Sequence, residues 1–242
     1  MTLSGRIQEY LRSVVERERE PVRAGAFVIY VHATSSHPYL NYAIPAADAK
    51  RDDGSELIRT ASERGLVPRL EYVEESFPWV EGALKQSGFV LEGRLRLITC
   101  TPDTVASLDP PCELHRVAPG SELVRPMLTV TAAAFGDGPP DDAAVARWNR
   151  NTVVAVRGGE VLGSASWTTV IDGISEIAGV AVGEQERRQG IGASLSVAAT
   201  RAAFADGASL AMLTPGHEGS ARVYERAGYS DLSTMLHLRR PD

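Results

Sequence analysis

The residues that most clearly suggest chemistry form a short turn, Arg187-x-x-Gly190-x-Gly192, directly before an apolar, alanine-rich run. That run has the pattern of a helix, and a strand-like segment, "EIAGVAV", ends just before the turn. The first N–H groups of a helix lack intrahelical partners and carry partial positive charge, so they bind phosphate. Glycine lets a phosphate approach the backbone closely. The spacing therefore predicts a phosphate-binding turn.

Three kinds of phosphate motif share these features. A Walker loop needs Gly-Lys-Ser/Thr after four spacer residues, but the only lysines are Lys50 and Lys85. A dinucleotide fingerprint needs a third glycine three residues after the second, where this sequence has Leu195. The remaining fit is the pyrophosphate turn of an acyl-coenzyme A site.

The second half of the chain predicts a mixed α/β unit around this turn. Two of its strands join at Gly158-Gly159, a typical hairpin turn. The expected elements are helices at 122–135 and 141–150, the hairpin at 151–170, a strand at 173–182, the turn and its helix, a strand at 208–214, a helix ending at 228 and a strand at 233–240.

The first half predicts a second mixed α/β unit, and a proline-rich linker separates the two. Four prolines within residues 99–120 disfavour both a helix and a central strand. Ahead of this segment we expect an amphipathic helix around 7–15, strands at 26–32 and 39–45, a helix at 55–65, a strand at 68–73, a helix at 78–88 and a strand at 94–100.

The two halves end in similar ways. "LKQSGF" at 84–89 and "YERAGY" at 224–229 both describe a helix that stops at a glycine followed by an aromatic residue, and each lies 14 residues after a strand leucine. Leu70 and Leu210 are those leucines, so the offset is 140 residues. This similarity favours an internal repeat. The halves differ at the glycine turn, because the first has "AADAKRDDGSEL".

Composition excludes several other classes of function. A net charge of −6 opposes sequence-independent binding of nucleic acid. Cys100 and Cys112 have no neighbouring ligands at metal-binding spacing, so we expect no metal site and no disulfide framework. No apolar run reaches the roughly 20 residues that span a bilayer, and the N-terminal segment mixes acids with bases, unlike a targeting peptide. We therefore expect a cytoplasmic protein without a membrane partner.

Taken together, the motifs of the second half resemble those of the GNAT superfamily of N-acyltransferases. The family's Arg/Gln-x-x-Gly-x-Gly/Ala turn is matched by Arg187, Gly190 and Gly192. A later signature, Ala-x-x-Tyr-x-x-x-Gly-aromatic, is matched by residues 221–229, although His217 stands where the family often has Asn. The resemblance covers about residues 113–240. It implies an α/β fold with a mixed (α+β) sheet.

The resemblance also implies how acetyl-CoA, the co-substrate, is bound. Free backbone N–H groups of the central strand would hold the pantetheine arm and polarise the thioester carbonyl, and the turn would hold the pyrophosphate. In this sequence the expected binding residues are Val180, Ala181, Val182, Arg187, Arg188, Gln189, Gly190, Ile191 and Gly192.

Two catalytic residues follow from the same resemblance. Tyr224 has the position of the family's tyrosine near the leaving sulfur. A phenol pKa of about 10 exceeds that of a thiol by about 1.5 units, so hydrogen bonding to the thiolate is favoured over full proton transfer. Glu176 lies 14 residues before Gly190, as does the strand glutamate that acts as base in the histone-acetylating branch. It is the candidate base for the amine.

We therefore expect an N-acetyltransferase that moves an acetyl group from acetyl-CoA to a small-molecule or peptide primary amine in a ternary complex. The alternatives are a catalytically silent acyl-CoA-binding or regulatory module and, less well matched, a nucleotide-binding protein. The identity of the amine is not encoded in a recognisable motif.

The expected domains are a degenerate GNAT-like lobe at 1–100, a linker at 101–112 and a complete GNAT domain at 113–242. At the 140-residue offset, the turn residues Arg187, Gly190 and Gly192 correspond to Ala47, Lys50 and Asp52. The sequence thus predicts one CoA site per chain. We expect a monomer, with a homodimer as the alternative.

Overall fold

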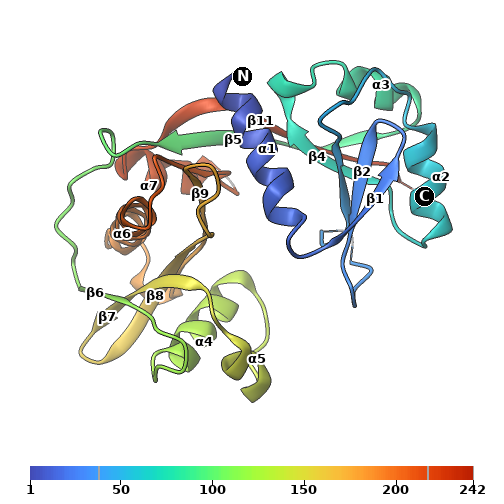
Figure 1. The fold of residues 1–242 in the computed structure, drawn as a ribbon. Coiled ribbons are helices and arrows are strands. Elements are labelled where there is room, and N and C mark those ends of the chain that lie inside the picture. Colours follow the sequence, from blue (N-terminus) through green and yellow to red (C-terminus); the bar gives the residue numbers. More distant parts are fainter. Residues whose placement is uncertain (38, 217, 242) are drawn as a thin grey trace. The chain divides into compact units, whose positions relative to one another are not determined.

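The computed structural model describes every residue except 38, 217 and 242 and divides the chain into two compact units. Unit 1 comprises Met1–Leu97 and Leu232–Asp242, and unit 2 comprises Ile98–Asp231. Both units combine helices with strands (Figure 1). The expected mixed α/β fold is confirmed.

Unit 1 is built on a mixed sheet with the strand order β1-β2-β3-β4-β11, followed by the first part of β5. Strands β1, β2 and β3 pair antiparallel, whereas β3 and β4 are parallel. Its elements are α1 (Leu3–Val15), β1 (Glu20–Ala24), β2 (Phe27–Val31), β3 (Tyr42–Pro45), α2 (Ser55–Glu63), β4 (Arg69–Val73), the 3-10 turn η1 (Glu74–Ser76), α3 (Val80–Gln86), β5 (Val90–Cys100) and most of β11 (Ser230–Arg239).

Helices cover both faces of the unit 1 sheet, and the side chains of β2 point alternately to the two faces. Phe27 and Ile29 join the core formed with α2 and α3. Tyr30 points to the other face and packs with Val15 of α1. This period of two is the pattern expected of a strand buried on both faces.

Unit 2 carries the end of β5 and then the strand order β10-β9-β8-β7-β6. Strands β9 and β10 are parallel, and the others pair antiparallel. Its elements are β6 (Glu113–Arg116), α4 (Val124–Phe135), α5 (Asp142–Arg147), β7 (Asn151–Arg157), β8 (Glu160–Trp167), β9 (Ile174–Val182), the 3-10 turn η2 (Glu184–Glu186), α6 (Ile191–Ala205), β10 (Leu210–Leu213) and α7 (Glu218–Arg226).

The main core of unit 2 lies between its sheet and α6. Leu195 and Ala199 on α6 are fully buried there, together with Ala165 of β8. A smaller core on the other face packs α4 against Val154 and Val156 of β7. Helices α6 and α4 therefore lie on opposite faces of the same strands (Figure 1).

Each unit is completed by the last strand of the other half of the chain. In unit 1, β4 pairs antiparallel with β11, with Leu70 opposite Leu238. In unit 2, β10 pairs antiparallel with the end of β5, with Ala211 opposite Cys100. The compact units thus place residues 232–242 with unit 1, whereas the expected domain 113–242 placed them with the second lobe. The expected boundaries themselves stay a prediction.

Two edge strands were missed from the sequence. Strand β1 begins at Glu20, the last residue of the charged run "ERERE", and β6 lies inside the proline-rich segment expected to be a linker. Both are short, and every residue of β6 except Leu114 is exposed, as is common in edge strands. The segment before β6 is also packed on unit 2, since the Ala106 N–H donates to the Ala227 carbonyl over 3.0 Å.

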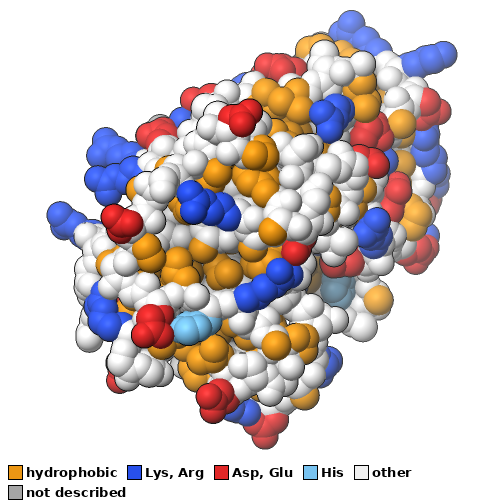
Figure 2. Space-filling model, turned by 60° about the vertical axis from the view of Figure 1, so that its left-hand side comes forward, with side chains coloured by type: hydrophobic (Ala, Val, Ile, Leu, Met, Phe, Trp, Pro, Cys, Tyr) orange, Lys and Arg blue, Asp and Glu red, His pale blue; other side chains and the backbone are white. Residues whose placement is uncertain are grey.

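Charged side chains of both signs occur on the surface. On the face drawn in Figure 2, Lys and Arg side chains stand among acidic and apolar ones and do not gather into a broad basic area. No helix in the described residues is long and apolar enough to cross a membrane.

Candidate functional site

Strand β9 carries a bulge that exposes part of its backbone. The register of β9 with β8 places two residues, Gly179 and Val180, opposite Ala165 alone. Gly179 has φ +61°, a left-handed conformation that glycine adopts without steric cost. As a result Ala178 and Gly179 are exposed in a strand that is otherwise buried or half-buried.

Strand β9 extends beyond the residues that pair with β10. In the described part of the chain the parallel ladder ends at the pair Glu176–Met212, while β9 continues to Val182, about 20 Å farther along. The predicted residues Val180, Ala181 and Val182 lie in this stretch. The strand edge beside them is therefore open to a ligand that needs backbone hydrogen bonds.

The glycine turn opens α6 without a side-chain cap. Gly190 is the N-cap residue with φ +85°, and Arg188 has φ +66°. Gly190 makes no side-chain hydrogen bond to the helix, so the first N–H groups of α6, including those of Ile191 and Gly192, are left for a ligand or water. No described heavy atom lies within 4 Å of the position that a Cβ on Gly190 would take.

The predicted turn residues differ in whether the side chain or only the backbone is accessible to a ligand. Arg187, Arg188 and Gln189 are exposed, and Arg187 Nε lies 3.4 Å from the Val182 carbonyl, which links the turn to the end of β9. Ile191 is 1% exposed, so its side chain belongs to the core and only its backbone is available to a ligand.

Arg157, at the end of β7, bonds to side chains of the glycine turn and of η2. It was not identified from the sequence. Its guanidinium donates to Gln189 Oε1 through both terminal nitrogens at 3.2 Å and forms an ion pair with Glu186 at 3.1 Å. Gln189 in turn donates to the Gln185 carbonyl at 3.3 Å. No local motif marks Arg157, because its partners lie about thirty residues later in the sequence.

Gly192 lies where β9, α6 and α7 meet. A Cβ there would stand 3.6 Å from Val182 and 3.5 Å from Val223, which are ordinary contacts. Gly163 on β8 is far more constrained, because its Cβ would stand 2.4 Å from the Ala181 carbonyl oxygen. Gly163 therefore lets β8 approach the end of β9, a second feature that the sequence did not reveal.

Tyr224 follows Val223 on α7 and is half-buried against the main core. Its ring packs edge-on against Tyr229, with centroids 6.1 Å apart. Burial raises the pKa of Tyr224 above its ordinary value. The phenol is therefore a weaker acid than in water and keeps its proton at neutral pH.

Glu176 marks the point where β9 and β10 part. Its N–H donates to Thr168 Oγ1 at 2.8 Å, and its carbonyl accepts from the Thr168 N–H at 3.0 Å. The side chain is half-buried. These two hydrogen bonds fix the backbone at Glu176.

Residues 122–229 match the model of the acetyltransferase (GNAT) family. This part of the chain belongs to the GNAT family. It includes Glu176, the turn and Tyr224, and it excludes unit 1. GNAT domains are acyltransferases, and acetyl-CoA-dependent N-acetylation of small-molecule or peptide amines is the family's general reaction.

Solved GNAT structures resemble the whole chain. A GCN5-related N-acetyltransferase from Kribbella flavida is 28% identical, with a TM-score of 0.85 over 100% of this chain and 97% of that one. A GCN5-related N-acetyltransferase from Sphaerobacter thermophilus is 18% identical (TM-score 0.64; 89% and 78% covered), and a GNAT acetyltransferase from Colwellia psychrerythraea is 10% identical (0.61; 100% and 98%). The last two show the fold alone. No curated protein matched the chain.

One position of the second GNAT motif is not described. His217, where the family often has Asn, lies outside the described residues. The rest of that motif is in place: Ala221 is buried, and Gly228 has φ +99°. A side chain at Gly228 would also meet the Thr104 carbonyl oxygen at 2.0 Å, so both conformation and space require glycine there.

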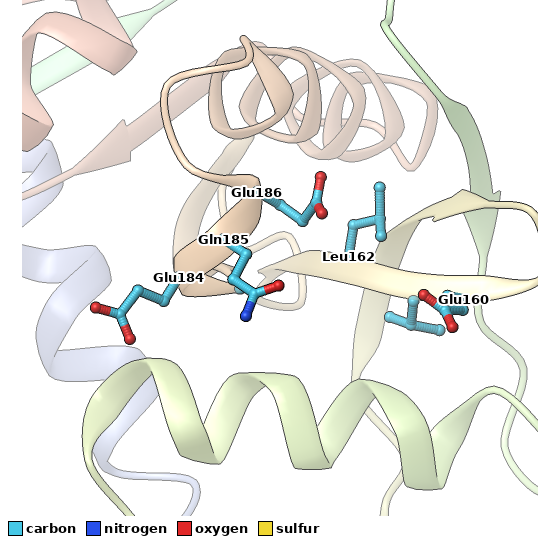
Figure 3. Close-up of a pocket in the computed structure, with 7 residues that line it drawn as sticks. Glu160, Leu162, Glu184, Gln185 and Glu186 are labelled. Carbon is cyan, nitrogen blue, oxygen red and sulfur yellow. The ribbon is translucent and has the colours of Figure 1, made fainter.

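The GNAT domain has an acidic hollow of about 350 Å³ beside η2. It is lined by Glu160, Glu184, Gln185 and Glu186, with Leu162 of β8 (Figure 3). Gln185 points toward the helix that runs along the hollow, and Glu184 points away to the side (Figure 3).

The two thiols of unit 2, which precede the residues that match the GNAT model, are not activated. Cys100 is buried and Cys112 half-buried, and burial raises the pKa of both thiols. Each is therefore a weak nucleophile at neutral pH. Among the described residues, no three His, Cys, Asp or Glu side chains are gathered so that they could hold a metal ion.

Proposed function

We propose that the GNAT domain transfers an acetyl group from acetyl-CoA to a cationic primary amine, by direct attack within a ternary complex. The observation that carries this proposal is the uncovered stretch of β9, which leads into an uncapped helix start at Gly190. An extended backbone edge followed by a cluster of free N–H groups suits a ligand with an amide-containing arm and a pyrophosphate.

The chain's own residues divide the work of binding acetyl-CoA. The backbone of Val180–Val182 would hydrogen-bond the pantetheine arm and polarise the thioester carbonyl. The N–H groups of Gly190–Gly192 would hold the pyrophosphate, and the exposed Arg187 and Arg188 would neutralise its charge. When bound, acetyl-CoA supplies the reactive thioester.

Tyr224 would stabilise the departing thiolate by donating a hydrogen bond. Its raised pKa makes full proton transfer to a thiolate less favourable than the sequence alone suggested. A neutral donor aimed at developing negative charge still lowers the barrier.

Glu176 would accept the proton that the attacking amine must lose, directly or through a water molecule. Replacing it by Gln keeps the size and removes the base. We expect Glu176→Gln to reduce kcat most at low pH, where fewer acceptor molecules are already deprotonated. A pH–rate profile parallel to that of the wild type would refute this role.

Direct attack is favoured over a covalent acyl-enzyme because neither thiol of unit 2 is activated. The raised pKa values of Cys100 and Cys112 argue against their carrying an acetyl group. Kinetics with both substrates should therefore give intersecting rather than parallel double-reciprocal lines.

A cationic acceptor is favoured by the charge of unit 2. This unit contains 16 acidic residues and 10 arginines, so the formal charge of −6 falls entirely within it. Several of its acids, Glu160, Glu184 and Glu186, line the hollow beside η2. Such a surface attracts positively charged amines.

The binding site is tested by a matched pair of variants, Gly192→Glu and Gly192→Gln. Both add a similar side chain where a Cβ has ordinary contacts, and an acid near a helix start does not weaken the helix. Repulsion of the pyrophosphate by Glu should weaken CoA binding by about tenfold to a hundredfold relative to Gln, a difference of 1.4–2.8 kcal/mol. Equal affinities in calorimetry would refute the site.

Gly190 is a less suitable probe, because its φ of +85° means that any other residue strains the turn itself. Once CoA binding is established, release of CoA thiol should be measured with a panel of cationic and neutral amines. Turnover with cationic amines supports the proposal. Binding without turnover on any amine would indicate a silent acyl-CoA-binding module.

We also propose that unit 1 is a degenerate GNAT-like lobe. Its element order, α1-β1-β2-β3-α2-β4-α3, repeats the order α4-β7-β8-β9-α6-β10-α7 of unit 2 once the short α5 is set aside. With a second lobe in the same chain, a monomer in the cytoplasm remains the expected state, to be checked by light scattering.

A further inference from the structure

The two units begin equivalent helices with the same turn. Helix α2 starts at Gly54 with φ +79°, and α6 starts at Gly190 with φ +85°. Arg51 and Arg187 each lie three residues before the glycine, so the Arg-x-x-Gly pattern occurs in both units. Gly54 and Gly190 are 136 residues apart, whereas the matched ends of the two halves are 140 residues apart. The loops that surround these helix starts therefore differ in length between the two units. The counterpart of Gly190 is therefore Gly54 and not Lys50, which the constant offset had suggested.

In unit 1 the N–H groups of this turn are already occupied by carboxylates. Asp52 Oδ1 accepts from the Gly54 N–H at 2.7 Å, and Asp53 Oδ1 accepts from the Ser55 N–H at 2.9 Å. The other Asp52 oxygen accepts from the Ala26 N–H at 3.2 Å. In the turn of unit 2 the same two positions before the glycine are Arg188 and Gln189, which cannot place an anion there.

The space over the turn is also filled in unit 1. A Cβ on Gly54 would lie 2.4 Å from Leu84 Cδ2, whereas nothing described lies within 4 Å of the same point at Gly190. Leu84 is fully buried. A phosphate could not reach the start of α2 without displacing this side chain.

Side chains also fill the gap between β3 and β4, the parallel strands of unit 1. Within the described residues, β3 and β4 pair at Ala43–Leu70 alone, and α1 makes hydrogen bonds to both strands beyond that pair. Gln8 Oε1 accepts from the Val73 N–H at 2.7 Å, and Arg12 donates to the Pro45 carbonyl at 2.6 Å.

Gln8 and Arg12 are one helical turn apart on α1, and they are 1% and 7% exposed. One side chain therefore reaches the end of β4 and the other the end of β3. In unit 2 the helix at this place in the order, α4, hydrogen-bonds Thr131 to Ser164 on β8 instead.

Gln8 and Arg12 fill this gap with incomplete hydrogen bonding. Gln8 Nε2 and Arg12 Nε are buried without a hydrogen-bond partner among the described residues. Buried polar atoms of this kind cost stability, but the same side chains satisfy the Val73 N–H and the Pro45 carbonyl, which apolar side chains would leave unpaired. Polar side chains suit this gap, because the edges of β3 and β4 present backbone groups there that need hydrogen-bond partners.

We infer that unit 1 contains an acyl-CoA-type site that its own side chains keep closed. Asp52 and Asp53 occupy the phosphate-binding N–H groups, Leu84 covers them, and Gln8 and Arg12 fill the slot between the strands. The chain therefore binds one CoA, in the GNAT domain. This inference rests on the proposed function, because it takes the GNAT domain as the open counterpart.

Calorimetry with CoA tests the stoichiometry. The wild type should bind one CoA per chain, and Gly192→Glu should lose at least tenfold in affinity with no second site emerging. A stoichiometry near two, or a tight site that persists in Gly192→Glu, would overturn the inference. A wild type that binds no CoA would contradict the proposed function, while agreeing with a closed unit 1.

The filling itself is tested with Gln8→Leu and Arg12→Met, which keep the volume and remove the hydrogen bonds. Gln8→Leu should raise the exchange rate of the Val73 amide hydrogen at least tenfold, and each variant should lower Tm by about 2–6 °C. KM for acetyl-CoA should stay unchanged. Arg17→Met, at an exposed position just after α1, serves as control. Unchanged exchange at Val73 together with an unchanged Tm would overturn the assigned contacts.

Discussion

The proposed role of Tyr224 is to donate a hydrogen bond to the leaving thiolate, and its half-buried position raises the pKa of the phenol and so keeps the donor protonated. We expect Tyr224→Phe to lower kcat by about tenfold to a hundredfold, the value of one hydrogen bond to a charged group, with little change in KM for acetyl-CoA. Because burial raises the pKa of Tyr224, ionisation of this phenol should not reduce the rate below pH 10. Steady-state kinetics between pH 6 and pH 10 would measure both effects.

The neighbouring Tyr229 provides the control. Its hydroxyl is 2.5 Å from Thr200 Oγ1 in the buried core. Tyr229→Phe should lower the free energy of unfolding by about 1–3 kcal/mol and leave kcat of the folded protein unchanged. If Tyr224→Phe also loses only stability, Tyr224 is a packing residue and the catalytic assignment fails.

Arg157 is predicted to position the pyrophosphate turn, because it bonds to Gln189 and Glu186 from outside. We expect Arg157→Ala to raise KM for acetyl-CoA about threefold to tenfold while kcat changes less than twofold. Arg157→Lys keeps an ion pair with Glu186 but loses the fork to Gln189, so it should restore part of the affinity. Arg147→Ala, at the end of α5, is the control. An equal KM in all three variants would exclude this role.

At the scale of elements, each unit depends on a strand from the other half of the chain. Leu236 and Leu238 of β11 are fully buried in the core of unit 1. We expect a chain that ends at residue 230 to lose the folded structure of unit 1, because both side chains and the whole pairing with β4 would be missing. Hydrogen exchange of the β4 amides would report this loss, and a chain that ends at residue 240 should behave as the wild type.

The same reasoning applies to a fragment of residues 113–242, the expected GNAT domain. It lacks Ile98 and Cys100, which belong to the core of unit 2 and pair with β10. This fragment should therefore be unfolded or aggregated, whereas a fragment that includes β5 should fold better. A stable, CoA-binding 113–242 fragment would show that β11 can take the place of β5.

The elements that the sequence identified correctly are those whose signal is local. The period of Ile7 to Val15 predicted α1, Gly158-Gly159 predicted the β7–β8 hairpin, and the glycine turn predicted the start of α6. The exchange of β5 and β11 could not be predicted, because the partner of a strand is distant along the chain and no local pattern in either strand specifies it. The roles of Arg157 and of Gln8, which fills the gap between β3 and β4, could not be predicted for the same reason. Both residues bond to partners that are distant along the chain.

At the scale of the molecule, the two units differ in charge. The formal net charge of −6 resides in unit 2, and unit 1 is neutral. If the acceptor is a cationic amine, this field should raise its local concentration and speed its encounter with the GNAT domain. Such steering weakens as salt shortens the screening length, from about 30 Å at 0.01 M to about 8 Å at 0.15 M ionic strength.

We therefore expect kcat/KM for a cationic acceptor, measured at saturating acetyl-CoA, to fall severalfold between these ionic strengths, while a neutral amine shows little change. Saturation separates this effect from the salt dependence of CoA binding at Arg187 and Arg188. Glu184→Gln, which removes one acid of the hollow, should reduce both kcat/KM for the cationic amine and its salt dependence. Glu18→Gln, an exposed acid of unit 1, should leave both unchanged. If the cationic and neutral amines respond equally to salt, the acidic surface of unit 2 does not select the acceptor.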